Sequence, residues 1–392
     1  MRKFAFIGLI FALPALAQTA FDSAVQSIVE NNAELHAARS RYLGETEAGK
    51  AENLLQGPEA EFEYKFGPRD AGNRWGVSVS QGFDWPGLYG ARRKENRYKA
   101  DAFRQLYMAE RTAVTLQART LLLDYVQARR DVVLLTEAEN NLRQLNDYLT
   151  KAYEHESTTI LVIKKTRREL FNISGRRADA EAAVVRIVEN LKAMGDGNID
   201  LSAVAAFPDM PLRPYEDYHV NMMLYDNTLA AKNSLVDAGN ASVGVNRAGR
   251  MPSFSVGYVH DFEDNTHFNG FSIGIGLPSW GKNHGASAAK ANALAALFEK
   301  EDYQQGLEAG LAADWHEASE LALRLTPVKE EFATDNYLEL LSKSFYGGQL
   351  TVFEYLREIN EYIDFRITLT ELEHRYTTVV ARLDRYNYSI SE

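Results

Sequence analysis

The stretch NGFSIGIGL at residues 269–277 alternates between large apolar side chains and small ones. Phe271, Ile273, Ile275 and Leu277 hold one phase, while glycine and serine hold the other. A period of two over this length is typical of a β-strand with one apolar and one small, polar face. The same period of two, with small or charged residues in the second phase, recurs in three other stretches: EAEFEYKF at 59–66, RWGVSVSQGF at 74–83 and SFSVGYVHDF at 253–262.

The length of these four strands matches a membrane-spanning β-strand, which needs about 9–11 residues. We therefore expect one face to meet lipid and the other to line a wet lumen; the alternative is an ordinary antiparallel sheet packed on a soluble core. Four strands cannot close a barrel, and an open edge is not tolerated in lipid, so the barrel would be shared between chains. The side chains expected to face lipid are Phe62, Tyr64, Val77, Val79, Phe254, Val256, Ile273 and Ile275.

An internal repeat relates the two strand pairs. A shift of 194 residues places 35–87 on 229–281 without a gap, and further on a shift of 192 aligns Lys151 with Lys343. The predicted organisation begins with a signal peptide at 1–17. A first repeat at 18–195 follows, with a strand pair at about 59–83 and long helices at about 89–195. A linker at 196–215 leads to a second repeat at 216–392, with a strand pair at about 253–277 and long helices at about 284–388.

The long segments outside the strands have coiled-coil spacing. From Leu121 to Ala152, apolar residues recur mostly at alternating steps of four and three, which is the seam of a left-handed supercoil. A helix of 60 residues extends about 90 Å, far beyond a globular domain. The sequence therefore predicts a mostly α fold with a small β part. We interpret the seams as core packing between neighbouring helices.

The N-terminus reads as an export signal. Arg2 and Lys3 precede an apolar run at 4–16, and Ala15-Leu16-Ala17 fits a small-x-small cleavage site. A membrane anchor is the weaker alternative, because a spanning helix needs about 20 apolar residues and Pro14 interrupts this run. The mature protein is therefore expected in the periplasm, outside the cell, or in an outer membrane.

Composition narrows the function class. The 392 residues carry a formal net charge of −11 and no cysteine, which argues against nucleic-acid binding, disulfides, thiolate zinc sites and a cysteine nucleophile. His260 and His267 flank an acidic segment, which we interpret as a solvated hairpin loop and not as a metal site. No nucleotide loop and no catalytic constellation stands out, so we expect neither enzyme activity nor a cofactor.

At this point the residues resemble a known family, the TolC-like outer-membrane efflux proteins, along the whole mature length. The segment GFDWPG at 82–87 is similar to the family's link from the second strand into the long helix. The segment FYGGQLTVFEYL at 345–356 is similar to its helix-hairpin tip, and Thr326-Pro327-Val328 is similar to its helical proline.

The resemblance implies a homotrimer with a 12-stranded β-barrel and a 12-helix α-barrel in the outer membrane of a Gram-negative bacterium, extending into the periplasm. It implies a passive exit duct of a tripartite efflux or secretion system. A periplasmic adaptor (membrane fusion protein) would link the duct to an inner-membrane pump, and metal cations or drugs are possible cargo. The alternative is a periplasmic coiled-coil adaptor or scaffold without a pore.

The resemblance also carries over site residues. The family's constriction is acidic; Glu354 matches one of its positions, and Arg357 stands at a second. The family's tip motif, which contacts the adaptor, is degenerate here, and the glycine of the first tip is lost. The residues at the tip positions are Lys151 and Thr159 in the first repeat and Lys343, Gly347, Gly348 and Thr351 in the second.

Overall fold

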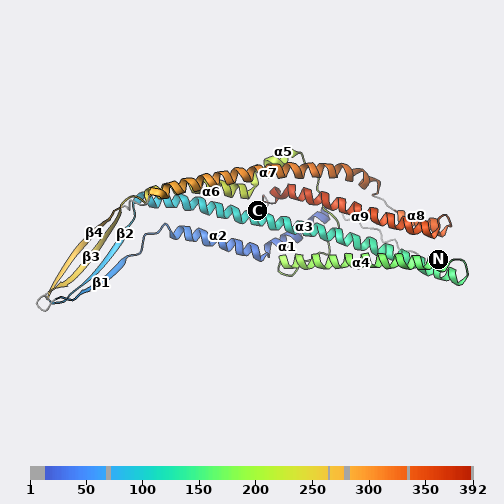
Figure 1. The fold of residues 1–392 in the computed structure, drawn as a ribbon, viewed down its shortest axis with the longest axis horizontal. Helices are drawn as coiled ribbons and strands as arrows, with labels where there is room; N and C mark the ends of the chain where they lie inside the picture. The colour runs from blue at the N-terminus through green and yellow to red at the C-terminus, as the bar shows by residue number, and fades with distance from the viewer. Residues whose placement is uncertain (1–13, 68–71, 264, 278–282, 333–335, 390–392) are drawn as a thin grey trace. The chain divides into compact units, whose positions relative to one another are not determined.

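A computed structural model describes residues 14–67, 72–263, 265–277, 283–332 and 336–389 (Figure 1). The predicted signal peptide thus lies mostly outside the described residues, and positions 14–17 begin the first helix. The first half of the chain contains α1 (Pro14–Glu30), α2 (Ala33–Ala51), β1 (Glu59–Lys65), β2 (Arg74–Phe83), α3 (Pro86–Glu154) and α4 (Ile160–Met194).

The second half repeats this order of two helices, a strand pair and long helices. Residues 195–214, between the halves, form neither helix nor strand. The elements are α5 (Tyr215–Tyr225), α6 (Asn227–Ala248), β3 (Ser253–Glu263), β4 (Thr266–Gly276), α7 (Asn283–Glu331), α8 (Tyr337–Tyr346), α9 (Val352–Leu383) and the short 3-10 helix η2 (Asp384–Ser389).

The chain divides into two compact units, and neither of them corresponds to one half of the sequence. The sheet unit comprises Ala37–Glu110 and Tyr225–Leu307, and the helical unit comprises Met1–His36, Arg111–Leu224 and Glu308–Glu392. Each unit therefore combines segments from both halves of the chain. The predicted class, mostly helical with a small sheet, is confirmed. Within the described residues, every helix is too short or too polar to cross a bilayer.

The four strands form one antiparallel sheet in the order β1-β2-β3-β4. Val77 lies opposite Phe62 on one side and His260 on the other, while Val256 lies opposite Ile273. Residues directly opposite each other project from the same face, so the register gathers all eight predicted lipid-facing side chains on one face. The β3–β4 pair extends further toward its turn than predicted, because Glu263 and residues 266–268 are also paired. The interpretation of 260–267 as a loop was therefore wrong for every described residue of that segment except Asn265.

On the opposite face of the sheet, glycines make room for serine side chains of the neighbouring strands. A Cβ on Gly257 would lie 2.6 Å from the Ser272 hydroxyl and 2.9 Å from the carbonyl oxygen of Val79. A Cβ on Gly274 would lie 2.4 Å from the Ser255 hydroxyl. Larger residues would collide here, so glycine lets the hydroxyls sit close over the neighbouring strand.

The helical unit contains two apolar clusters. One joins α1, the middle of α3, the end of α4 and the 195–214 segment. The other joins the distal parts of α3, α4, α8 and α9. The coiled-coil seam predicted on α3 contributes directly, with side chains no more than 2% exposed at Leu135, Ala138, Leu142, Leu145 and Leu149.

The sequence patterns do not predict the helices α1, α2, α5 and α6, which precede the strand pairs. In α2 and α6 the buried positions are held largely by alanine, such as Ala38, Ala231 and Ala238. Alanine has high helix propensity but gives a weak apolar periodicity. The signal that marks a helix in a sequence is therefore faint in these segments.

Candidate functional site

The two helix-hairpin tips adopt the same turn. In the second tip the Gln349 N–H donates to the Ser344 carbonyl at 2.9 Å. In the first tip the Ser157 N–H donates to the Ala152 carbonyl at 2.8 Å. Both pairs are related by the shift of 192 residues found in the sequence, so the repeat persists at the level of single hydrogen bonds.

A left-handed residue lies at the centre of each turn. Gly348 has φ +74°, and its counterpart Glu156 has φ +57°. A side chain costs about 1–2 kcal/mol in this conformation. The first tip therefore keeps the turn despite losing the glycine, and it stores this strain at an exposed position.

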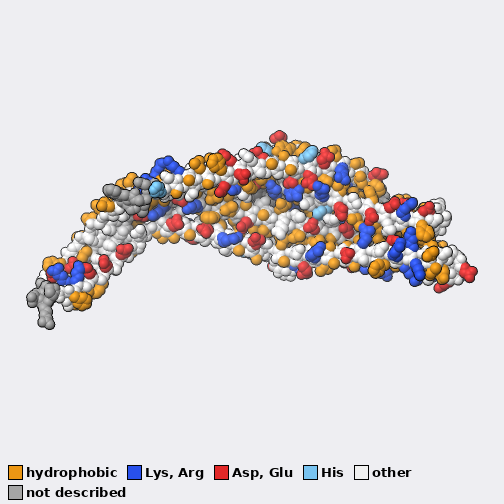
Figure 2. Space-filling view, viewed as in Figure 1, with side chains coloured by type: hydrophobic (Ala, Val, Ile, Leu, Met, Phe, Trp, Pro, Cys, Tyr) orange, Lys and Arg blue, Asp and Glu red, His pale blue; other side chains and the backbone are white. Residues whose placement is uncertain are grey.

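The α3–α4 and α8–α9 hairpins end at the same end of the helical unit (Figure 1), and side chains from all four helices share one apolar cluster there. The rings of Tyr148 on α3 and Tyr346 on α8 lie 5.5 Å apart, and the ammonium of Lys165 on α4 lies 4.4 Å from the ring centroid of Phe353 on α9. Lys and Arg side chains are prominent over this end of the helical unit (Figure 2). The predicted tip residues that are exposed here are Lys151, Thr159, Lys343, Gly347, Gly348 and Thr351.

Glu354 lies in the first turn of α9, where it closes a capping box with Thr351. The Thr351 N–H and hydroxyl both donate to Oε2 of Glu354 at 2.8 Å, and the Glu354 N–H donates back to the hydroxyl at 3.3 Å. These hydrogen bonds, the backbone one first, lower the pKa of Glu354. The carboxylate therefore stays ionised at an exposed site. The signal was readable in the sequence, because Thr-x-x-Glu before an apolar run is a capping box.

Arg357 pairs with carboxylates of its own helix. Its guanidinium lies 3.1 Å from Glu358 and 3.7 Å from Glu361. Glu358 also accepts a hydrogen bond from the Tyr337 hydroxyl at 2.9 Å, and this bond and the one from Arg357 lower its pKa. The positive charge at the second predicted constriction position is therefore balanced within the chain.

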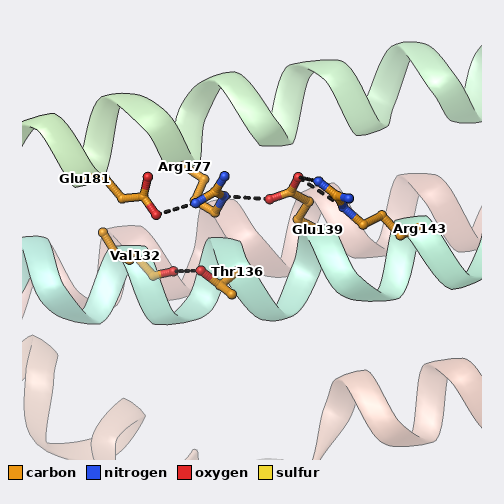
Figure 3. A network of polar contacts seen from close by, with 6 residues as sticks. All are labelled: Val132, Thr136, Glu139, Arg143, Arg177 and Glu181. Atoms are coloured by element: carbon orange, nitrogen blue, oxygen red, sulfur yellow. Dashed lines mark hydrogen bonds and ion pairs between the residues drawn. The ribbon is translucent and has the colours of Figure 1, made fainter.

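Behind the tips, a buried carboxylate links α3 to α4 (Figure 3). The side chain of Glu139 is 5% exposed and accepts hydrogen bonds at 2.6 Å from both Arg143 and Arg177. Arg177 also pairs with Glu181 on its own helix. The bond from Arg143 is the main cause of the lowered pKa of Glu139. The sequence alone does not reveal this network, because its two helices meet only in the folded hairpin.

A second carboxylate joins three long helices. Glu373 on α9 has a side chain that is 12% exposed, and it pairs with Arg130 on α3 at 2.6 Å and with Lys329 on α7 at 2.7 Å. In the next position, the His374 ring lies 2.7 Å from the Asp124 carboxylate on α3. These contacts fix the long helices of the helical unit to one another.

Helix α4 carries two parallel heptad seams. One faces the chain's own helices through residues such as Ile163, Ile173 and Leu191. The other is shifted by two positions and is exposed throughout, with Leu161 at 73%, Phe171 at 77% and Val185 at 62%. We call this second set the outer seam; its members are Leu161, Lys164, Arg168, Phe171, Gly175, Ala178, Ala182 and Val185.

The apolar face of the sheet is also open. Phe271 is 88% exposed, Ile273 is 80% exposed and Phe62 is 66% exposed. Among the residues that the structure describes, no group of three or more His, Cys, Asp or Glu side chains is arranged to hold a metal ion.

No protein-family model and no curated protein matches the sequence. Solved structures do match. The outer-membrane channel OprN is 13% identical, with a TM-score of 0.77 over 95% of this chain and 90% of that chain. The CmeC outer membrane channel of Campylobacter jejuni is 14% identical, with a TM-score of 0.76 over 96% and 87%. The open-state MtrE outer membrane channel of Neisseria gonorrhoeae is 14% identical, with a TM-score of 0.74 over 94% and 88%.

The chain has the TolC-like fold. The family resemblance seen in the sequence is thereby confirmed at the level of architecture. The TolC-like match extends over both the sheet unit and the helical unit, because each alignment covers at least 94% of the chain.

Proposed function

We propose that this protein is the outer-membrane exit duct of a tripartite efflux or secretion system. It would lie in the outer membrane of a Gram-negative bacterium and extend into the periplasm. The exposed apolar face of the four-stranded sheet carries this proposal. Phe271 and Ile273 are at least 80% exposed, and a contiguous apolar face of this kind indicates a membrane or protein contact.

The two faces of the sheet favour lipid outside and water inside. Aromatic and branched side chains crowd one face, and Ser78, Ser255 and Gly257 lie on the other. A sheet with small side chains on one face curves easily toward that face, as a barrel wall must. The alternative, a periplasmic scaffold without a pore, offers no role for such a sheet.

The open edges of the sheet favour assembly of several chains. Within the described part of the chain, the sheet order leaves β1 and β4 without outer neighbours, and unpaired backbone groups are too costly in lipid. Three copies would give twelve strands, the stoichiometry that the resemblance implies. The outer seam of α4 favours the same assembly, since its exposed apolar side chains Leu161, Phe171 and Val185 offer contacts to a neighbouring helix.

The partners follow from the same proposal. Transport through the duct would be passive, and a partner inner-membrane pump would supply the energy through an adaptor. The exposed tip residues around Gly347 and Thr351 would contact that adaptor, as proposed from the sequence.

A conductance measurement tests the proposed function. Full-length protein purified in detergent is expected to run as a trimer and to form discrete conducting events in a planar lipid bilayer. A stable, water-soluble monomer that leaves the bilayer silent would refute the channel and favour the scaffold.

The same recording tests Glu354 as the constriction. Three symmetry-related carboxylates around a narrow opening would attract cations, so Glu354→Gln is expected to lower cation selectivity and to weaken block by a trivalent cation. Glutamine also completes a capping box, and trimer yield should therefore stay unchanged. Thr351→Ala is the control, because it removes the cap and keeps the charge. An unchanged reversal potential and unchanged block in Glu354→Gln would move the constriction elsewhere.

A further inference from the structure

Two histidines meet at the end of the β3–β4 hairpin. His260 lies opposite Asn269, and His267 lies opposite Phe262, so the two imidazoles are diagonal neighbours on the apolar face of the sheet. Nε2 of His260 and Nδ1 of His267 are 3.3 Å apart. The ring centroids are 5.3 Å apart and the ring planes differ by 30°, so the two nitrogens are close enough to share one ligand.

A polar chain holds one imidazole in a defined tautomer. Nδ1 of His260 lies 2.8 Å from Oδ1 of Asn269, and the Tyr258 hydroxyl donates to the same oxygen at 2.6 Å. An amide oxygen can only accept, so Nδ1 of His260 carries the proton. The lone pair of His260 is therefore on Nε2, which points at His267. A ring N–H bonded to a fixed acceptor is the usual support of a metal-binding histidine.

We propose that His260 and His267 bind one divalent transition-metal ion that prefers nitrogen ligands, such as Cu²⁺, Ni²⁺ or Zn²⁺. Nitrogen ligands lie about 2.0–2.1 Å from zinc. Two such ligands at a tetrahedral angle are about 3.3–3.4 Å apart, which is the separation that the two imidazole nitrogens already have. The separation thus fits chelation, and the two imidazoles need only turn about their side-chain bonds to direct both lone pairs at the ion, without movement of either strand.

The proton balance of binding is simple. In the metal-free pair, the proton between the two rings belongs to Nδ1 of His267, which donates to Nε2 of His260. A metal ion needs both lone pairs, so that proton moves through solvent to Nε2 of His267. The ring stays neutral, and no net proton is released.

The surroundings select the class of ion. The neighbouring carboxylates Asp261 and Glu263 alternate to the opposite face of β3. Calcium and magnesium require several oxygen ligands, which the two imidazoles do not supply, whereas imidazole suits copper, nickel and zinc. Water would complete the coordination, and the bound ion would brace β4, the edge strand, against β3.

Trp75 provides a built-in reporter. The centroid of its ring lies 5.6 Å from that of His260. Cu²⁺ bound at the pair would therefore quench the fluorescence of Trp75, one of four tryptophans in the chain.

The experiment titrates Cu²⁺ and Ni²⁺ into the full-length protein in detergent, with calorimetry and tryptophan fluorescence as readouts. We expect one ion per chain and partial quenching by Cu²⁺. His260→Gln or His267→Gln should weaken binding at least tenfold, and Trp75→Phe should remove the quenching but not the binding. Asn269→Ala should weaken binding about 10–100-fold, as expected when the acceptor that holds a ligand histidine in place is lost, and Asn269→Asp should retain it.

His316→Gln is the matched control, because this exposed histidine lies on α7 and should leave the titration unchanged. The double variant H260Q/H267Q isolates the site from any other copper-binding group in the chain. If this variant bound the same number of ions as the wild type with the same affinity, the site would be refuted. Retained trimer yield and circular dichroism would show that the variants still fold.

Discussion

Arginine in place of Ile273 is expected to destabilise the membrane-inserted protein by about 2–4 kcal/mol per chain. Ile273 is 80% exposed on the apolar face of the edge strand β4, and in the proposed barrel it meets lipid. A guanidinium there would have to stay hydrated inside the hydrocarbon layer. Urea unfolding in lipid vesicles would measure the loss, and trimer yield in membranes should fall with it.

Gly270→Arg is the matched control for this substitution. Gly270 lies on the same strand but on the opposite face, and a Cβ at this position would meet no atom within 4 Å. Because the chain has no cysteine, single cysteines at Ser272 and Ile273 give a second test. The cysteine at 272 should react faster with a water-soluble maleimide. Equal reaction rates, or equal destabilisation by both arginines, would contradict the assignment of the two faces.

Removing both partners of Glu373 is expected to cost about 3 kcal/mol of folding free energy. The double substitution Arg130→Met and Lys329→Met leaves a carboxylate that is 12% exposed without a counter-charge. Breaking a buried pair costs about 3–5 kcal/mol, and we take the lower end because Lys329 is largely exposed. Denaturant unfolding of the detergent-purified protein would measure the change.

The pH dependence of this loss has a defined sign. Burial alone would raise the pKa of Glu373, but Arg130 and Lys329 more than offset it, so the pKa is lowered. In the wild type the pair stabilises the fold above the unfolded pKa of about 4.3, and that contribution is lost as pH falls through the lower folded value. In the double variant the penalty should be largest near neutral pH and should shrink on acidification. Adding Glu373→Gln should restore stability at neutral pH; no rescue would refute the account.

The strand pairs were predictable from the sequence because strand geometry allows few arrangements of the side chains. Alternation of period two determines which side chains share a face, and the register then places Phe62, Val77, Val256 and Ile273 together as the sequence indicates. The seam of α3 was predictable for the same reason, since a repeat of alternating threes and fours allows one packing surface.

Contacts between distant segments were not predictable. Glu139 and Arg177 are 38 residues apart, and nothing local in the sequence couples them. The outer seam of α4 was hidden because small and basic residues fill most of its positions. The His260–His267 pair was obscured by an acidic segment that suggested a loop, whereas the pairing of β3 with β4 continues to Glu263 and Thr266.

The open edges at β1 and β4 have a consequence for how the protein matures. A single chain that has just been exported would expose two unpaired sheet edges and the outer seam of α4. Its unpaired edges could therefore form strand pairs with other extended peptides before it reaches the membrane. The single chain would also be unstable in the bilayer, because the unpaired backbone groups at its sheet edges cannot be hydrated there. In the proposed assembly, insertion and oligomerisation would then be one concerted event. The lifetime of the unassembled chain, more than its folding, would limit how much finished duct a cell can produce.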